Sequence, residues 1–323
     1  MATITVPHPL PSPEEDAKKL RKAFQGFGTD ENAIIEVLGH RTAAQRAEIA
    51  RTYARLYGET LVEGLRSELS GDFLNAVILW VMDPAERDAE LANKALKNKG
   101  DWHIWDIWHI WVIIEVACAS DPDHLMAVRK AYCSRFSSSL EEDVASRFAH
   151  EQPLGQLLVR LVSSYRYTGE HVNEGLAQSE AEELYDAIRI PHHERVIRIL
   201  STRNKSQLKS TFNHYKQHYG KAIDEDIESS GSSQFTSMLK VAVRCIGSPE
   251  KHFAEVVRSS VLGLGTDEDS LTRAIVSRAE IDMKQIKEEY KNRYNTTLNA
   301  DVIGDTSGDY KNFLLTLVGS ADP

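Results

Sequence analysis

The sequence has few cysteines, no long uninterrupted apolar run and no excess of basic residues. Its three cysteines, Cys118, Cys133 and Cys245, are too few and too scattered for a disulfide framework or a zinc site, and they favour a reducing compartment such as the cytosol. The N-terminal stretch lacks a charged start followed by an apolar core, so we expect no secretory signal. The longest apolar candidate, residues 102–119, is interrupted by charged residues and histidines, so we expect no segment that spans a membrane unaided.

The balance of charge limits the partners. The 323 residues include 38 lysines and arginines against 48 aspartates and glutamates, a formal net charge of −10. A negative surface disfavours nucleic acid as a partner, and it equally disfavours unaided attachment to anionic lipid. A divalent cation that bridges protein and lipid removes the second objection.

A short glycine motif is present near both ends of the chain. Gly26-Phe-Gly-Thr-Asp-Glu31 is matched by Gly263-Leu-Gly-Thr-Asp-Glu268, and a carboxylate, Glu68 or Asp305, follows forty residues after the second glycine of each copy. Two glycines around one apolar residue allow a tight loop that turns its carbonyl oxygens outward, and a distant carboxylate can complete an oxygen cage. One copy alone would suggest only a helix end followed by a cap. Two copies with the same partner carboxylate indicate a site for a hard cation, and calcium fits this donor set best.

The chain also contains four copies of a larger unit. Anchor residues spaced 79, 83 and 75 positions apart are each followed by a tyrosine after twelve residues, an aromatic residue four further on and an aliphatic residue four beyond that. The anchors are Arg41, Ser120, Arg203 and Arg278, and the tyrosines are Tyr53, Tyr132, Tyr215 and Tyr290. We therefore predict a tail over residues 1–13 and four tandem repeats over residues 14–86, 87–166, 167–247 and 248–323.

Helical periodicity dominates each repeat. Apolar spacing predicts five helices in the first repeat, with breaks at Gly26 to Gly28 and at Gly58. Thr29 is expected to cap the second helix, and Thr42 with Gln45 has the spacing of a capping box for the third. Because no stretch shows sustained two-residue alternation, we predict an all-α fold of four tandem repeats, five helices in each, in one compact domain.

These repeats and their glycine loops resemble the annexin family, and the restriction of intact loops to the first and last repeats resembles its plant branch. The resemblance covers the chain after residue 14. It implies two calcium sites, each built from three loop carbonyls and one bidentate carboxylate. The implied ligands are Phe24, Gly26, Gly28 and Glu68 in the first repeat, and Val261, Gly263, Gly265 and Asp305 in the fourth. Accessory sites would map to Thr29 with Glu31 and to Thr266 with Glu268.

The same resemblance implies calcium-dependent binding to anionic phospholipid membranes by a cytoplasmic protein, with Ca²⁺ as cofactor and no catalytic residues. Carbonyls and a single carboxylate leave coordination positions open, and lipid phosphate is the natural ligand to fill them. Phe27 and Leu264, at the loop tips, would add apolar contact with the bilayer.

The second and third repeats depart from the pattern. Arg147 and Ser230 stand near the position of the carboxylate, and neither repeat has the glycine loop, so we expect no calcium there. The second repeat instead carries Trp102, Trp105, Trp108 and Trp111. This segment is either an interfacial membrane anchor or a helix extension whose Trp111, Ile114 and Val116 enter the core.

Other functions are alternatives. Asp305 to Gly308 resembles one element of nucleotide hydrolases, but no Gly-x-x-x-x-Gly-Lys loop accompanies it. His40 is the residue to which a peroxidase proposal for relatives would point, yet no further haem ligands accompany it. A membrane-associated calcium conductance is a third class. Two further partner hypotheses are self-association and actin binding, the latter through Ile188-Arg189-Ile190 or Ile197-Arg198-Ile199.

Overall fold

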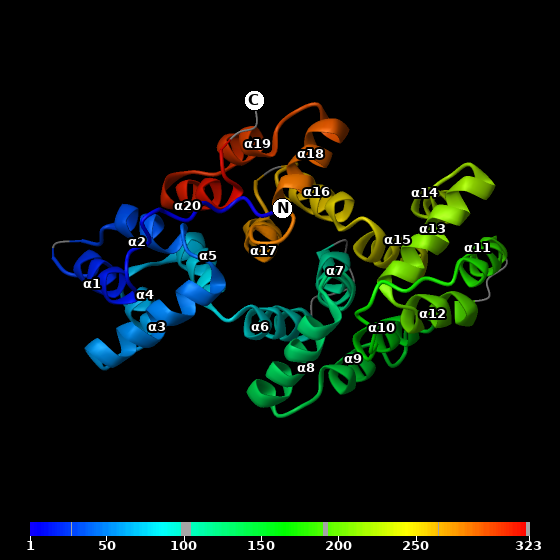
Figure 1. Ribbon diagram of the computed structural model, residues 1–323, viewed down its shortest axis with the longest axis horizontal. Helices are drawn as coiled ribbons and strands as arrows, with labels where there is room; N and C mark the ends of the chain where they lie inside the picture. The colour runs from blue at the N-terminus through cyan, green and yellow to red at the C-terminus, as the bar shows by residue number, and fades with distance from the viewer. Residues whose placement is uncertain (27, 98–104, 190–192, 264, 321–323) are drawn as a thin grey trace. The chain divides into compact units, whose positions relative to one another are not determined.

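The computed structural model describes the whole chain except residues 27, 98–104, 190–192, 264 and 321–323 (Figure 1). Within the described residues, all regular secondary structure is α-helical, and twenty helices follow one another in four sets of five. The prediction of an all-α fold built from four five-helix repeats is confirmed.

The helices of the first two repeats have these bounds: α1 (Pro13–Ala23), α2 (Glu31–Leu38), α3 (Ala43–Tyr57), α4 (Leu61–Glu68), α5 (Gly71–Val81), α6 (Pro84–Lys97), α7 (Trp105–Cys118), α8 (Pro122–Phe136), α9 (Leu140–Arg147) and α10 (Leu154–Val162). Those of the last two are α11 (Glu174–Arg189), α12 (His193–Thr202), α13 (Lys205–Tyr219), α14 (Ile223–Ser230), α15 (Gln234–Gly247), α16 (Pro249–Ser260), α17 (Glu268–Arg278), α18 (Met283–Tyr294), α19 (Leu298–Asp305) and α20 (Gly308–Val318).

The helices form two compact units. Unit 1 comprises Met1–Pro84 and Phe253–Pro323, and unit 2 comprises Ala85–His252. Unit 1 therefore combines the first and fourth repeats, which lie at opposite ends of the sequence and carry both glycine motifs. Unit 2 contains the two repeats that lack the motif.

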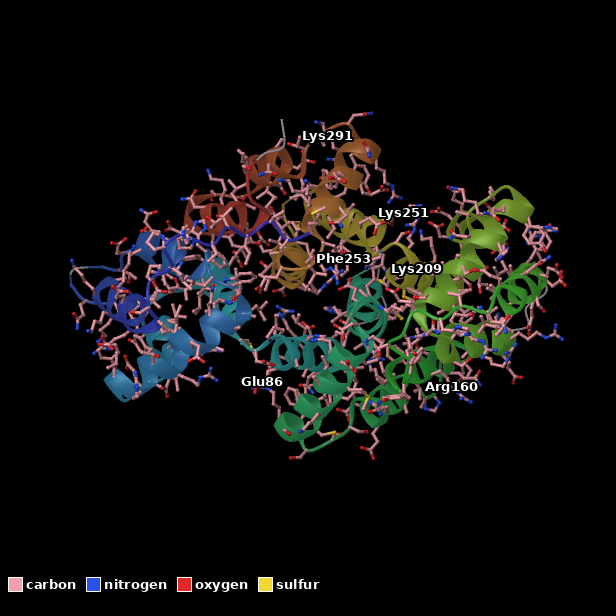
Figure 2. All side chains as sticks on the ribbon, viewed as in Figure 1. Glu86, Arg160, Lys209, Lys251, Phe253 and Lys291 are labelled. Carbon is pink, nitrogen blue, oxygen red and sulfur yellow. The ribbon has the colours of Figure 1, made fainter. Side chains whose placement is uncertain are left out.

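The core of unit 1 joins its two repeats. Helices α2 and α5 of the first repeat pack on α17 and α20 of the fourth. Phe73 of α5 meets Phe313 of α20 edge to face, with ring centroids 5.9 Å apart. Phe253, labelled in Figure 2, is buried on α16 beneath the guanidinium of Arg278. Aromatic and aliphatic burial of this kind supplies most of the stability of such a helical unit.

The N-terminal tail belongs to the same unit and runs beside α20 (Figure 1). The Thr3 amide donates to the Ala279 carbonyl at 3.0 Å, and the Thr3 hydroxyl donates to the Leu317 carbonyl at 2.6 Å. Farther along, Thr5 contacts His40 in the first repeat. The tail thus forms hydrogen bonds with both repeats of unit 1.

Each of the three anchor arginines forms an ion pair with a carboxylate of its own repeat. Arg41 forms a two-pronged ion pair with buried Asp16, Arg203 pairs with Glu180, and Arg278 pairs with Asp282. In the second repeat, where Ser120 replaces the arginine, the ammonium of Lys205 binds the carbonyls of Cys118 and Ser120 at 2.5 and 2.6 Å. A cation at the C-terminus of α7 is favourable because the last carbonyls of a helix lack partners.

The repeated tyrosines also have a common role. All four are fully buried, and each hydroxyl contacts a carboxylate at or near the start of the fourth helix of its repeat. In the second repeat, for example, Tyr132 donates to Asp143 at 2.6 Å. These bonds hold the third helix of each repeat against the start of the fourth. In the first and fourth repeats, this fourth helix ends at Glu68 or Asp305.

The tryptophan segment is only partly described. Trp111, Ile114 and Val116 of α7 are buried, so the packing interpretation is confirmed for these three residues. Trp102 lies outside the described residues, as do the side chains of Trp105 and Trp108, so the anchor hypothesis stays a prediction. Among the helices that could be searched, none is long and apolar enough to cross a membrane.

Candidate calcium sites

The first glycine loop leaves α1 through a left-handed turn. Phe24 caps the helix, and the Asp30 amide reaches back to the Ala23 carbonyl at 3.0 Å. Between them Gly26 has φ +125° and Gly28 has φ +89°. Side chains disfavour these angles, so glycine is what allows the backbone to turn here.

The fourth repeat reproduces this loop 237 positions later. Gly263 and Gly265 have φ values of +125° and +95°, and the Asp267 amide donates to the Ser260 carbonyl at 2.8 Å. Asp267 adopts φ −89° and ψ 86°, against −91° and 82° for Asp30. The two motifs therefore fold to nearly the same backbone conformation.

Each distant carboxylate lies against its loop. Glu68 is the last residue of α4, and the Thr29 hydroxyl donates to its Oε2 at 2.9 Å. Asp305 is the last residue of α19, and the Thr266 hydroxyl donates to its Oδ2 at 2.9 Å. The forty-residue separation in sequence thus becomes a direct contact in both repeats.

The role expected for Thr29 as the helix cap is wrong. Asp30 caps α2, and its side chain accepts from the Ala33 amide at 3.0 Å. Asp30 directly precedes the first turn of α2 and its carboxylate satisfies one of the exposed amides there, while the Thr29 hydroxyl instead donates to Glu68. The capping box of Thr42 and Gln45 is confirmed.

The oxygen atoms of both sites are available to an ion. Within the described part of the chain, no hydrogen bond is donated to the carbonyls of the six loop residues, Phe24, Gly26, Gly28, Val261, Gly263 and Gly265. The second oxygens of the Glu68 and Asp305 carboxylates likewise accept no hydrogen bond there, and neither carboxylate joins an ion pair with a described residue. Neutral carbonyls and a carboxylate form the donor set that Ca²⁺ prefers.

A side-chain cluster would be needed for a transition metal. The described residues contain no group of three or more histidines, cysteines, aspartates and glutamates placed to hold an ion. The loops instead offer backbone oxygen, which suits a hard cation and not a soft one.

The second and third repeats present different chemistry at the same helix ends. Arg147 ends α9 and lies 3.8 Å from Glu151, while Ser230 ends α14 and donates to the Ile227 carbonyl at 2.7 Å. Helix α11 continues to Arg189, whose guanidinium pairs with Asp226 at 2.8 Å. Neither repeat places a carboxylate at the position of Glu68.

The remaining sequence candidates occupy ordinary structural positions. His40 Nδ1 lies 2.8 Å from the Thr5 carbonyl and 2.9 Å from its hydroxyl. Cys118 and Cys245 are buried and Cys133 is exposed, each as a free thiol. His193 is half-buried against the ring of Phe235.

The second tripeptide considered for actin binding is mostly inaccessible. Ile197 and Ile199 are buried in α12, and Arg198 pairs with Glu183 at 2.8 Å. The first tripeptide ends at Ile190, which lies outside the described residues.

Comparison with known proteins identifies the family. A sequence model of the annexin family matches residues 15–80, 179–242 and 252–317. The chain therefore belongs to the annexin family. Annexin D3 of Arabidopsis thaliana is 50% identical to this annexin over 99% of each chain. The structure of annexin III has a TM-score of 0.89 and 31% identity, covering 100% of this chain and 98% of that one.

A calcium-bound structure is among the similar ones. Calcium-bound annexin (Sm)1 has a TM-score of 0.84 and 29% identity, covering 97% of this chain and 91% of that one. The family model leaves residues 81–178 of this annexin unmatched, a stretch that contains the Trp-rich segment and Arg147.

Proposed function

We propose that this annexin binds anionic phospholipid membranes in a calcium-dependent manner, at two sites in unit 1. The first would use the carbonyls of Phe24, Gly26 and Gly28 with Glu68. The second would use those of Val261, Gly263 and Gly265 with Asp305. The main support is the duplication itself: two loops have matching glycine angles, free carbonyls and a carboxylate held by a threonine.

Coordination chemistry explains why lipid would complete the site. Calcium takes six to eight oxygen ligands, whereas three carbonyls and one bidentate carboxylate supply about five. Phosphate oxygens and water can occupy the remaining positions. One carboxylate also neutralises only half of the charge of the ion, so the loaded site would attract an anionic headgroup although the chain carries a net charge of −10.

Two sites on one compact unit favour binding to an extended surface. Once one loop holds a phosphate, the other faces lipid at a high effective concentration, so the combined affinity exceeds that of either site. The protein would then be cytoplasmic without calcium and peripheral on membranes with it. We further propose that it acts by binding and not by catalysis.

Vesicle sedimentation tests the proposal. Phosphatidylserine vesicles should sediment the wild-type chain in calcium and release it with a chelator, and phosphatidylcholine vesicles should bind it less. Glu68→Gln or Asp305→Asn should each weaken binding by about tenfold or more, because each removes one of two cooperating sites. The double variant should not bind.

Matched controls come from the degenerate repeats. Arg147→Gln and Ser230→Ala change the corresponding helix ends of unit 2 and should leave calcium-dependent binding as it is. Binding that persists in the chelator, or that survives the double substitution, would contradict the assigned sites.

A further inference from the structure

The two candidate sites share a backbone but differ in the side chains that surround them. A constant offset of 237 residues relates the two repeats, so Gln25 corresponds to Leu262 and Arg66 to Ile303. Gln25 and Leu262 directly precede the first glycine of their loops, whereas Arg66 and Ile303 lie two residues before the carboxylates Glu68 and Asp305. The same two positions are therefore polar or basic at one site and aliphatic at the other.

The aliphatic pair is unusually exposed. Leu262 is 56% exposed and Ile303 is 53% exposed, although most large aliphatic side chains of the unit are buried. Leu262 adjoins Gly263, and Ile303 lies in the last turn of α19 together with Asp305. Because Thr266 binds Asp305, this turn and the loop meet at one corner of the unit. Folding does not use these two side chains, so they are available to an apolar environment.

The first repeat presents charge at the same corner. Arg66 is exposed on α4, and Lys22 is exposed in the last turn of α1, where the fourth repeat has Ser259. Neither basic side chain forms an ion pair within the described ranges. Two free cations beside a site of this kind suit the anionic surface of the headgroup layer.

We propose that the two sites contact the membrane in different ways. At the fourth repeat, Leu262 and Ile303 insert below the headgroups. At the corresponding positions of the first repeat, Gln25 and Arg66 remain at the headgroup level, where Arg66 and Lys22 bind the anionic headgroups. This inference rests on the proposed function and assigns a separate contact to each of its two sites. The partner of the exposed pair Leu262 and Ile303 is therefore the interfacial region of the bilayer.

The two contacts differ in their response to salt. Burial of aliphatic side chains at the interface is not screened by ions, so its contribution persists at high ionic strength. Attraction between exposed lysine or arginine and anionic lipid falls as the Debye length shortens from about 10 Å at 0.1 M to about 3 Å at 1 M. Salt dependence therefore separates the two sites experimentally.

The first experiment measures affinity for phosphatidylserine vesicles in saturating calcium, at low and at high sodium chloride. Leu262→Gln with Ile303→Gln should lower affinity by about three- to tenfold at both salt concentrations. Lys22→Gln with Arg66→Gln, the matched pair at the first site, should lower it by about tenfold at low salt and hardly at all at high salt. All four residues are exposed, so the thermal unfolding of both variants should match that of the wild type.

The second experiment locates each loop directly. In a Cys133→Ser background, which removes the exposed thiol, a polarity-sensitive fluorophore is attached through Leu262→Cys or through Gln25→Cys. On calcium-loaded vesicles, the probe at position 262 should shift to the blue and be quenched from within the bilayer. The probe at position 25 should report water.

The outcomes separate this inference from the function on which it rests. A wild-type chain that fails to bind vesicles in calcium would overturn the proposed function. Normal wild-type binding with no loss in the Leu262 and Ile303 variant, or with equal quenching at positions 25 and 262, would overturn only the difference between the sites.

Discussion

The ion pair between Arg41 and Asp16 is buried, so breaking it should lower the stability of the fold far more than breaking an exposed pair of the same length. Both N···O distances are 2.7 Å, and each side chain is 4% exposed. Arg41→Met would leave the carboxylate of Asp16 buried without its counterion. Breaking a buried pair in this way costs about 3–5 kcal/mol, a large share of the ~5–15 kcal/mol by which a typical protein is stable.

The same helix supplies the control. Lys18 and Glu14 on α1 are also 2.7 Å apart, but their side chains are 62% and 51% exposed. Lys18→Met should therefore produce no measurable change, because water and salt screen an exposed pair.

Urea unfolding followed by circular dichroism provides the measurement. Arg41→Met together with Asp16→Leu removes both charges, so the double variant should recover most of the stability that the single variant loses. The reasoning fails if Arg41→Met is no more destabilising than Lys18→Met, or if the double variant is as unstable as the single one.

Two further predictions concern a buried carboxylate and a loop glycine. Burial would raise the pKa of Asp88, but the charge of Arg87 and the hydrogen bond with His124 outweigh burial and lower this pKa below 3.8. The charged form of Asp88 therefore stabilises the fold above about pH 3.8. Asp88→Asn should lower the urea midpoint at neutral pH. The difference in midpoint between wild type and variant should shrink as the pH falls through the folded-state pKa of Asp88. Gly28→Ala places a side chain at φ +89°, so it should lower the free energy of unfolding by about 1–2 kcal/mol and weaken vesicle binding. Gly304→Ala is the control: it lies in a helix with free space around it, so it should produce neither effect.

Periodicity in the sequence was sufficient to predict the helices. The buried tyrosines and the anchor arginines recur because each makes the same contact in its repeat, and such contacts leave a spacing that can be counted. The contact of Glu68 with its loop followed from the same logic, since two copies with one separation imply one geometry.

Other features depend on distances that a sequence does not contain. The combination of the first and fourth repeats in unit 1 joins the two ends of the chain, and nothing in a tandem pattern specifies which repeats pair. Thr29 and Asp30 are both good caps by residue type, and only the folded structure shows that Asp30 accepts from the Ala33 amide while Thr29 donates to Glu68. The exposure of Leu262 and Ile303 was equally hidden, because large aliphatic residues are expected to be buried.

A crystal structure of the chain grown with calcium and a short-chain phosphatidylserine would test the central claim most directly. The account predicts one ion in each loop of unit 1, about 2.3–2.6 Å from the loop carbonyls and from both oxygens of Glu68 or Asp305, with lipid phosphate among the remaining ligands. It also predicts no ion at the helix ends marked by Arg147 and Ser230. Ions bound at those positions, or empty loops in a complex that still holds the lipid, would contradict it.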